Sequence, residues 1–244
     1  MDKAKWTSLC RRRNFLALVL GFGLLYGLMS SGFISMQYQG IIITIGIYVL
    51  LAASLNLTTG VLGELVLGHA GFMSIGAYTA ALFTLHMDLP ALVEFPLALL
   101  LGGALAAVFG VLIGIPALRL RGDYLAIVTL GFGEIIRVII QNLKVAGGMG
   151  LDKGAAGQAL IGIDRLANLY VVFWITVVTV VLLFMFARSR YGRAVKAIRD
   201  DEIAAEAMGI NLAHHKRMAF IISSFFAGIS GALLAMYQTT VQAN

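Results

Sequence analysis

Residues 188–217 read RSRYGRAVKAIRDDEIAAEAMGINLAHHKR, the longest polar run in a chain that is otherwise mostly apolar. Apolar stretches flank this segment, residues 169–187 before it and residues 218–237 after it. About 20 consecutive apolar residues are enough to cross the hydrocarbon core of a bilayer. The pattern therefore predicts a polar loop between two membrane-spanning helices.

A short helix is expected inside this loop, over residues 201–210. Asp200, Asp201 and Glu202 crowd its start, where negative charge suits the helix dipole. Gly209 marks its end, because glycine is the usual residue just beyond a helix C-terminus.

The expected helix has one apolar face, on which Ile203 and Ala207 lie one turn apart with Met208 beside them. A short amphipathic helix on a basic loop between two spans is typical of a docking element for another protein. The alternative is a solvated loop with an incidental helix, and the pattern alone leaves both open.

Composition indicates an all-α, polytopic integral membrane protein, a bundle of about seven transmembrane helices. Apolar residues make up 60% of the chain and charged residues 12%. A β-barrel is excluded, because its alternating segments of about ten residues do not occur here. Cys10 is the only cysteine, which excludes an intrachain disulfide and a cysteine zinc cluster. The expected spans cover approximately residues 14–33, 40–58, 65–85, 96–117, 124–143, 169–187 and 218–237.

The distribution of the 18 Lys and Arg residues predicts the orientation. Fourteen fall in the N-terminal tail or after the second, fourth and sixth spans, whereas Lys144, Lys153 and Arg165 fall on the opposite side and Arg137 lies within a span. Basic residues accumulate in cytoplasmic loops. We therefore expect a basic cytoplasmic tail over residues 1–13, a membrane domain over residues 14–244 and a cytoplasmic loop over residues 188–217. The net charge of +6 then reflects topology rather than nucleic-acid binding.

Small residues recur at spacings of three or four residues in three spans, which predicts close helix packing because lipid gives no hydrophobic drive between helices. These stripes are Gly102, Ala106, Gly110 and Gly114; Ala70, Ser74, Ala77 and Ala81; and Ser224, Gly228 and Ala232. The glycine-rich segment 144–168 is expected to be external, as a flexible connection or a partner contact. The dipeptide Gly-Lys does not occur, so the chain has no phosphate-binding loop of its own.

Charged groups fall within the fifth expected span. Glu134 and Arg137 are three residues apart on one face, and Gln141 continues the stripe. Two charges in a span oppose insertion by about 5–7 kcal/mol, which nearly cancels the contribution of its apolar residues. The stripe must therefore face the bundle or a wet cavity. A Glu134–Arg137 pair that locks the bundle, so that Glu134→Ala costs mainly stability, and a lining of a transport path both remain open.

His69 lies near the start of the third expected span, five residues after Glu64. Its imidazole has two interpretations. It forms a hydrogen bond between helices, or it acts as a proton relay or substrate contact. The spacing of His residues indicates no metal site, and no Ser/His/Asp set is recognisable, so we expect neither a metal nor an enzyme.

Several stretches resemble the branched-chain amino acid ABC transporter permeases of the LivM type, within the LivHM subfamily of binding-protein-dependent permeases. They run in the same order as in that family from about residue 50 to residue 238. The matching stretches are LNL at 55–57 with Gly60, LGHAGF at 67–72, IGAYTAA at 75–81, RLRGDYLAIVTLGFGEIIR at 119–137, AIRD at 197–200 and AAEAMGIN at 204–211.

The resemblance implies that residues 188–217 form the loop that couples such permeases to their ATPase. The family's Glu-Ala-Ala…Gly motif is matched by Ala204, Ala205 and Gly209, whereas Ile203 stands where the motif has Glu. The residues implied in coupling are Asp201, Glu202, Ala204, Ala205, Glu206 and Gly209. The candidates for the translocation path or bundle lock are His69, Glu134, Arg137 and Gln141.

The resemblance further implies an ABC importer subunit in the bacterial inner membrane, translocating leucine, isoleucine or valine. Its partners would be a second, LivH-type permease subunit, cytoplasmic ABC ATPases that use the ATP, and a periplasmic binding protein. Urea, short amides and other amino acids are alternative substrates. The family has further spans after the seventh, which this sequence is expected to lack, so a truncated permease is also considered.

Two other functions remain open from the sequence. An ion-coupled secondary carrier would use Glu134, Arg137 and His69 and would need no ATPase. A membrane scaffold without transport activity is the third hypothesis.

Overall fold

The computed structural model of the 244-residue chain describes residues 36–87, 90–120, 122–142, 159–161 and 167–242. The chain divides into two compact units, Met1–Ile42 and Ile43–Asn244. Of the first unit only residues 36–42 are described. The expected N-terminal tail, the first expected span and most of the glycine-rich segment lie outside the described residues. The packing between helices is therefore that of the second unit.

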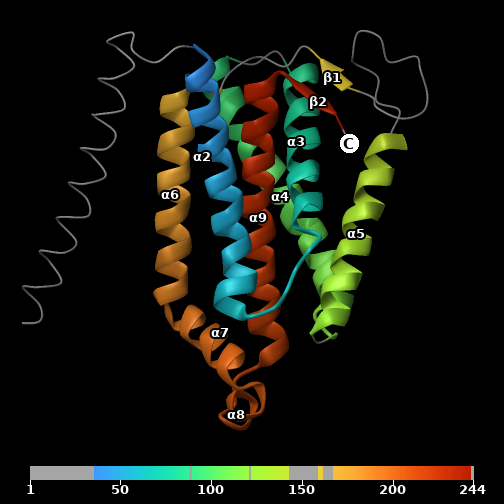
Figure 1. Ribbon diagram of the computed structural model, residues 1–244, viewed down its shortest axis with the longest axis vertical. Coiled ribbons are helices and arrows are strands. Elements are labelled where there is room, and N and C mark those ends of the chain that lie inside the picture. The colour runs from blue at the N-terminus through green and yellow to red at the C-terminus, as the bar shows by residue number, and fades with distance from the viewer. Residues whose placement is uncertain (1–35, 88–89, 121, 143–158, 162–166, 243–244) are drawn as a thin grey trace, which may run out of the picture. The chain divides into compact units, whose positions relative to one another are not determined.

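The described residues are mainly helical (Figure 1). In chain order the elements are α2 Met36–Asn56, the π-helical turn η1 Leu57–Leu62, α3 His69–His86, α4 Ala91–Ala117, α5 Asp123–Asn142, β1 Ala159–Ile161, α6 Leu169–Arg188, α7 Arg190–Asp200, α8 Glu202–Ala207, α9 Leu212–Gln238 and β2 Thr240–Gln242. The two short strands pair antiparallel, with Leu160 opposite Val241.

Helix α9 forms the centre of the second unit, with α3 and α4 packed against it (Figure 1). In its most apolar window 61% of residues are buried, against 28% in the corresponding windows of α2 and α6. Those two helices therefore leave most of their apolar surface outward, as a helix facing lipid or a partner must.

Glycines allow the backbones of α3 and α9 to approach closely. A Cβ atom added at Gly76 would lie 2.0 Å from the carbonyl oxygen of Gly228, and one added at Gly231 would lie 1.8 Å from that of Met73. No side chain fits at either contact. Small residues permit this approach, which gives the van der Waals packing that holds helices together in lipid.

The predicted small-residue stripes of α4 and α9 are confirmed. Gly102, Ala106, Gly110 and Gly114 are all buried. An added Cβ at Gly110 would meet Ser224, one at Gly228 would meet Ala106, and one at Gly102 would meet Ala232. The α3 stripe is right only in part: Ala77 and Ala81 are buried, but Ala70 is exposed, and the closest approach runs through Gly76.

Four helical segments are long and apolar enough to cross a membrane: Gln37–Leu62, Ala91–Ala117, Leu169–Arg188 and Leu212–Gln238. The chain is therefore a polytopic helical membrane protein. Helices α3 and α5 correspond to the other two expected spans within the described residues. They are less apolar, because α3 is rich in buried small residues and α5 carries a charged pair.

Four helix starts differ from the prediction by four to six residues, and α7 was not predicted. Helix α2 begins at Met36 rather than residue 40, and α3 begins at His69 rather than residue 65. Helix α4 begins at Ala91 rather than residue 96, and α9 begins at Leu212 rather than residue 218. Apolarity indicates only the part of a helix that needs a bilayer, so the polar first turns of α9 went unrecognised. The start of α4 was placed at Pro96 because proline is common at the first position of a helix, but Pro96 lies inside α4. Helix α7 has its own signals, an N-cap at Ser189 and buried Val195 and Ile198 three residues apart.

Helices α7 and α8 lie together with η1 and the beginning of α9 at the lower end of Figure 1. The turn after α2 and the segment after α6 are thus on the same side, as the predicted topology requires. That this side is cytoplasmic, with the N-terminus, stays a prediction.

Candidate functional site

The polar loop over residues 188–217 contains two short helices, α7 and α8, rather than the one that was expected. Helix α8 covers Glu202–Ala207, so the helix predicted over residues 201–210 is in the right place but shorter. Asp201 caps it: the carboxylate Oδ1 accepts the N–H groups of Ile203 at 2.9 Å and Ala204 at 3.0 Å. Gly209, at φ +82°, provides the left-handed turn after the helix.

One side of α8 packs against the protein and the other is exposed. Ala205 is 5% exposed, whereas Ile203 is 79% and Met208 83% exposed. Ala204, Glu206 and Ala207 are also exposed. The predicted face of Ile203, Ala207 and Met208 is therefore outward. Ala205 cannot belong to that outward face, because its side chain is covered, and it instead anchors α8.

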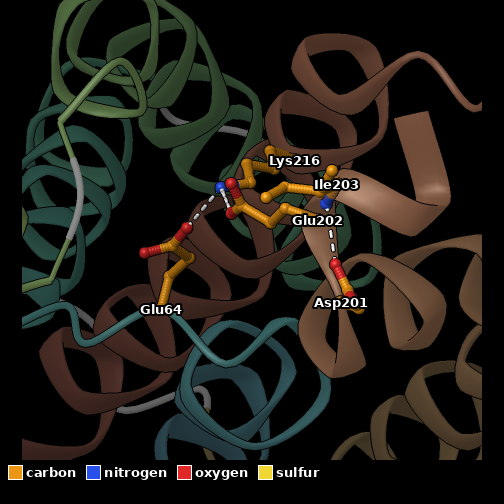
Figure 2. Close-up of polar contacts among 5 residues, drawn as sticks. All are labelled: Glu64, Asp201, Glu202, Ile203 and Lys216. Atoms are coloured by element: carbon orange, nitrogen blue, oxygen red, sulfur yellow. Dashed lines mark hydrogen bonds and ion pairs between the residues drawn. The ribbon is translucent and has the colours of Figure 1, made fainter. Parts of the chain in front are cut away.

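Lys216, in the first turns of α9, holds two carboxylates (Figure 2). Its Nζ donates to Glu64 Oε1 at 2.6 Å and also contacts the carboxylate of Glu202 in α8. The side chains of Lys216 and Glu64 are 6% and 11% exposed. The sequence did not predict this cluster, because Glu64 precedes Lys216 by 152 residues and nothing local indicates the pairing.

Helix α7 packs on η1. The Arg199 guanidinium donates to the carbonyl oxygen of Gly60 at 2.9 Å. Val195 lies in a small buried cluster with Leu62 and Ala219. The stem of Arg199 occupies the space in which Gly63 would carry a Cβ. These contacts fix α7 to the turn that follows α2.

The predicted pair between Glu134 and Arg137 forms on α5, with Arg137 Nε 2.9 Å from Glu134 Oε2. The side chains remain 58% and 45% exposed, so within the described residues the pair is not buried against neighbouring helices. Gln141 lies one turn further along and is half-buried. The stripe faces outward from the second unit, where lipid could not solvate the charges.

His69 is buried at the start of α3 and contacts α2. Its Nε2 lies 2.9 Å from Ser54 Oγ, and Ser54 Oγ in turn donates to the carbonyl oxygen of Leu51. Ser223 of α9 donates to the carbonyl oxygen of Ser54 at 2.5 Å. This geometry supports the interpretation of His69 as a hydrogen-bonding group between helices. The structure does not bring its imidazole together with the exposed carboxylate of Glu134.

Within the described residues no group of three or more His, Cys, Asp or Glu side chains could hold a metal ion. A small cleft between α3, α4, α5 and α9 is lined by Phe72, Ile113, Thr129 and Phe220, among others, and is almost entirely apolar.

Residues 37–244 match the model of a family described as branched-chain amino acid transport system / permease component. The chain belongs to this permease family. Three relatives illustrate the similarity. The high-affinity branched-chain amino acid transport system permease protein LivM of Escherichia coli is 38% identical over 219 residues, which cover 79% of this chain and 51% of that protein.

The probable branched-chain amino acid transport permease protein LivM of Methanocaldococcus jannaschii is 27% identical, over 61% of this chain and 44% of that protein. The D-allose transport system permease protein AlsC of Escherichia coli is 30% identical, over 65% of this chain and 46% of that permease. The chain spans about half the length of the curated relatives it matches. No solved structure matches it.

Proposed function

We propose that the chain forms a transmembrane permease subunit of an ABC importer in the bacterial inner membrane, and that α8 is the element that docks on a cytoplasmic ATPase. The observation that carries this proposal is the exposed apolar face of a capped helix, with Ile203 79% and Met208 83% exposed. An apolar helix face fits the helix-in-groove mode of recognition. The six residues of α8 span about 9 Å, at 1.5 Å per residue.

ATP would be hydrolysed by the partner, because this chain has no phosphate-binding loop. The further partners of the proposed importer are a second permease subunit and a periplasmic binding protein that delivers substrate. The names of the relatives favour branched-chain amino acids as substrates. The similarity to a D-allose permease shows that related chains serve other substrates, so a binding assay on the partner binding protein must identify the cargo.

A lining of the translocation path is the role that we propose for Glu134 and Arg137. Their side chains are exposed on a helix of the membrane domain. Charges at such a position require water, a partner or each other. The pair gives each side chain one charged hydrogen bond. We propose that water in the path or the second permease subunit supplies the remaining hydrogen bonds.

The docking proposal is tested by replacing the exposed apolar side chains of α8. We expect Ile203→Asp together with Met208→Asp to abolish ATP-driven uptake in vesicles that contain the partner subunits, because a charge must be desolvated to enter an apolar groove. Membrane insertion should be unchanged, since neither side chain contributes to the core. The matched control is Ile203→Val with Met208→Leu, which keeps the face apolar and should keep uptake.

Uptake that survives both aspartates would contradict docking through α8. An ion-coupled secondary carrier remains the second candidate, favoured by the charged stripe of α5. It predicts uptake by the purified chain alone, driven by an ion gradient and without ATP.

A further inference from the structure

Lys216 connects two segments that are far apart in the chain, helix α8 and the loop between η1 and α3. Its ammonium group lies between the carboxylates of Glu64 and Glu202 (Figure 2). Counted over the whole residue, Lys216 is 5% exposed and Glu64 is 9% exposed. Removing the lysine from this cluster would leave two neighbouring carboxylates without a cation in a poorly solvated place. The contact therefore holds both segments firmly.

Helix α8 has few other attachments among the described residues. Asp201, with extended backbone at φ −158° and ψ 111°, separates it from α7. Gly209 turns the chain away at its other end. The one side chain of α8 that is buried is Ala205. A short helix between two such joints can shift as a unit, and the bond from Glu202 to Lys216 would carry the shift inward.

The loop that holds Glu64 leads directly to the contact between α3 and α5. Leu67 N–H donates to Thr129 Oγ1 of α5 at 3.2 Å. A Cβ atom added at Gly68 would lie 1.9 Å from the carbonyl oxygen of Thr129 and 3.5 Å from the nitrogen of Gly133, one turn further along the same face of α5. Movement of this loop therefore displaces α3 and α5 together, and α5 bears the charged stripe.

We propose that Lys216 is a positioning residue that relays movement of α8 to residues 63–68 and so to the α3–α5 contact. The inference rests on the proposed docking of an ATPase at α8. The two bonds of Lys216 act in series: Glu202 ties the docking helix to the lysine, and Glu64 ties the lysine to the loop. Breaking either bond should therefore separate α8 from the loop.

A distance measurement on the full chain in lipid nanodiscs tests the link without any partner. Spin labels are placed at Met208→Cys and Leu67→Cys, two positions that are 83% and 51% exposed, in a Cys10→Ser background. We expect Glu202→Ala and Glu64→Ala each to broaden the distance distribution. The matched control is Glu206→Ala, which removes an exposed carboxylate from the same helix and should leave the distribution as in the parent.

A distribution that stays narrow in both variants overturns the link. Each variant leaves Lys216 with one carboxylate, so the charge remains compensated and misfolding is not the expected cause of broadening. Helicity and thermal unfolding of each variant confirm that the fold is retained.

A second measurement tests the relay itself, with ATPase and binding protein present. Glu64 is buried, so it cannot contact the ATPase directly. We expect Glu64→Ala to lower the uptake per ATP hydrolysed about tenfold, the size of a typical coupling free energy between sites, while ATP hydrolysis continues. A broadened distance with unchanged uptake per ATP overturns the relay. If the parent chain shows no ATP-driven uptake, the proposed function fails, and the distance measurement still decides whether Lys216 holds α8 to the loop.

Discussion

The charged residues of this chain differ most in how well they are covered. Lys216 and Glu64 are almost completely buried, whereas Glu134 and Arg137 are about half exposed. A buried charged group is stabilised mainly by its charged partner, whereas an exposed one is stabilised mainly by the solvent, lipid or subunit around it. The two pairs therefore predict opposite results when one partner is removed.

Lys216→Met should destabilise the chain by about 3–5 kcal/mol, because it leaves the buried carboxylate of Glu64 and the partly buried carboxylate of Glu202 facing each other without a cation. The midpoint of thermal unfolding in detergent measures the effect. Arg217→Met is the control, since Arg217 is the next residue of α9 and is exposed. Equal midpoints for the two variants would show that the cluster contributes nothing to the fold.

Glu134→Ala should leave the unfolding midpoint nearly unchanged and lower the rate of uptake. From the sequence, a pair that locks the bundle and a lining of the transport path were both open. The exposed fractions of the two side chains favour the lining. Ile135→Ala, on the exposed surface of the same helix, is the control for uptake. A variant that unfolds easily but transports normally would favour the pair that locks the bundle.

At the scale of elements, packing between α3, α4 and α9 depends on positions without a side chain. Gly76→Ala would place a methyl group 2.0 Å from the carbonyl oxygen of Gly228 and force the two helices apart. We expect a cost of about 1–3 kcal/mol, as for overpacking of other cores. Thermal unfolding in the same detergent measures it.

Gly131→Ala is the matched control for this substitution. An added Cβ at Gly131 meets nothing within 4 Å, and alanine is the better helix former by about 1 kcal/mol. The control should therefore keep or raise the unfolding midpoint. Equal midpoints for Gly76→Ala and Gly131→Ala would contradict the close approach of α3 and α9.

Much of the helix packing and of the helix boundaries could be predicted from the sequence. The stripe of Gly102, Ala106, Gly110 and Gly114 gave the packing face of α4, because its spacing is a local property. The acidic residues at its start and Gly209 at its end placed α8 for the same reason. Helix α7 was missed, since a polar amphipathic helix resembles a solvated loop when only apolarity is considered.

The contacts between distant segments could not be predicted. Glu64 and Lys216 are 152 residues apart and meet only because α9 packs beside η1. A single sequence does not show which charged residues come into contact. The exposure of Glu134 and Arg137 likewise depends on which neighbours cover α5. The sequence thus indicated some of the charged residues, and tertiary packing determines which of them are buried together and which stay exposed.

At the scale of the whole molecule, the proposed importer needs a mechanical contact between the helices in the membrane and an ATPase outside it. The helical bundle carries α7 and α8 at one end, and the exposed apolar face of α8 is the proposed contact with that ATPase. Family membership and the apolar helices support the membrane part. Docking of the ATPase on α8 is the central proposal, because ATP hydrolysis in a partner would move the helical bundle only through such a contact.

Photo-crosslinking from position 208 in intact cells tests this claim most directly. With a photoreactive amino acid in place of Met208, which is 83% exposed, we expect an adduct with a nucleotide-binding ATPase subunit, identified by mass spectrometry. The same probe at Ala167, a buried position of the described chain far from α8 in sequence, should give no such adduct. Absence of the ATPase adduct at position 208, or capture of a periplasmic protein there, would contradict docking through α8.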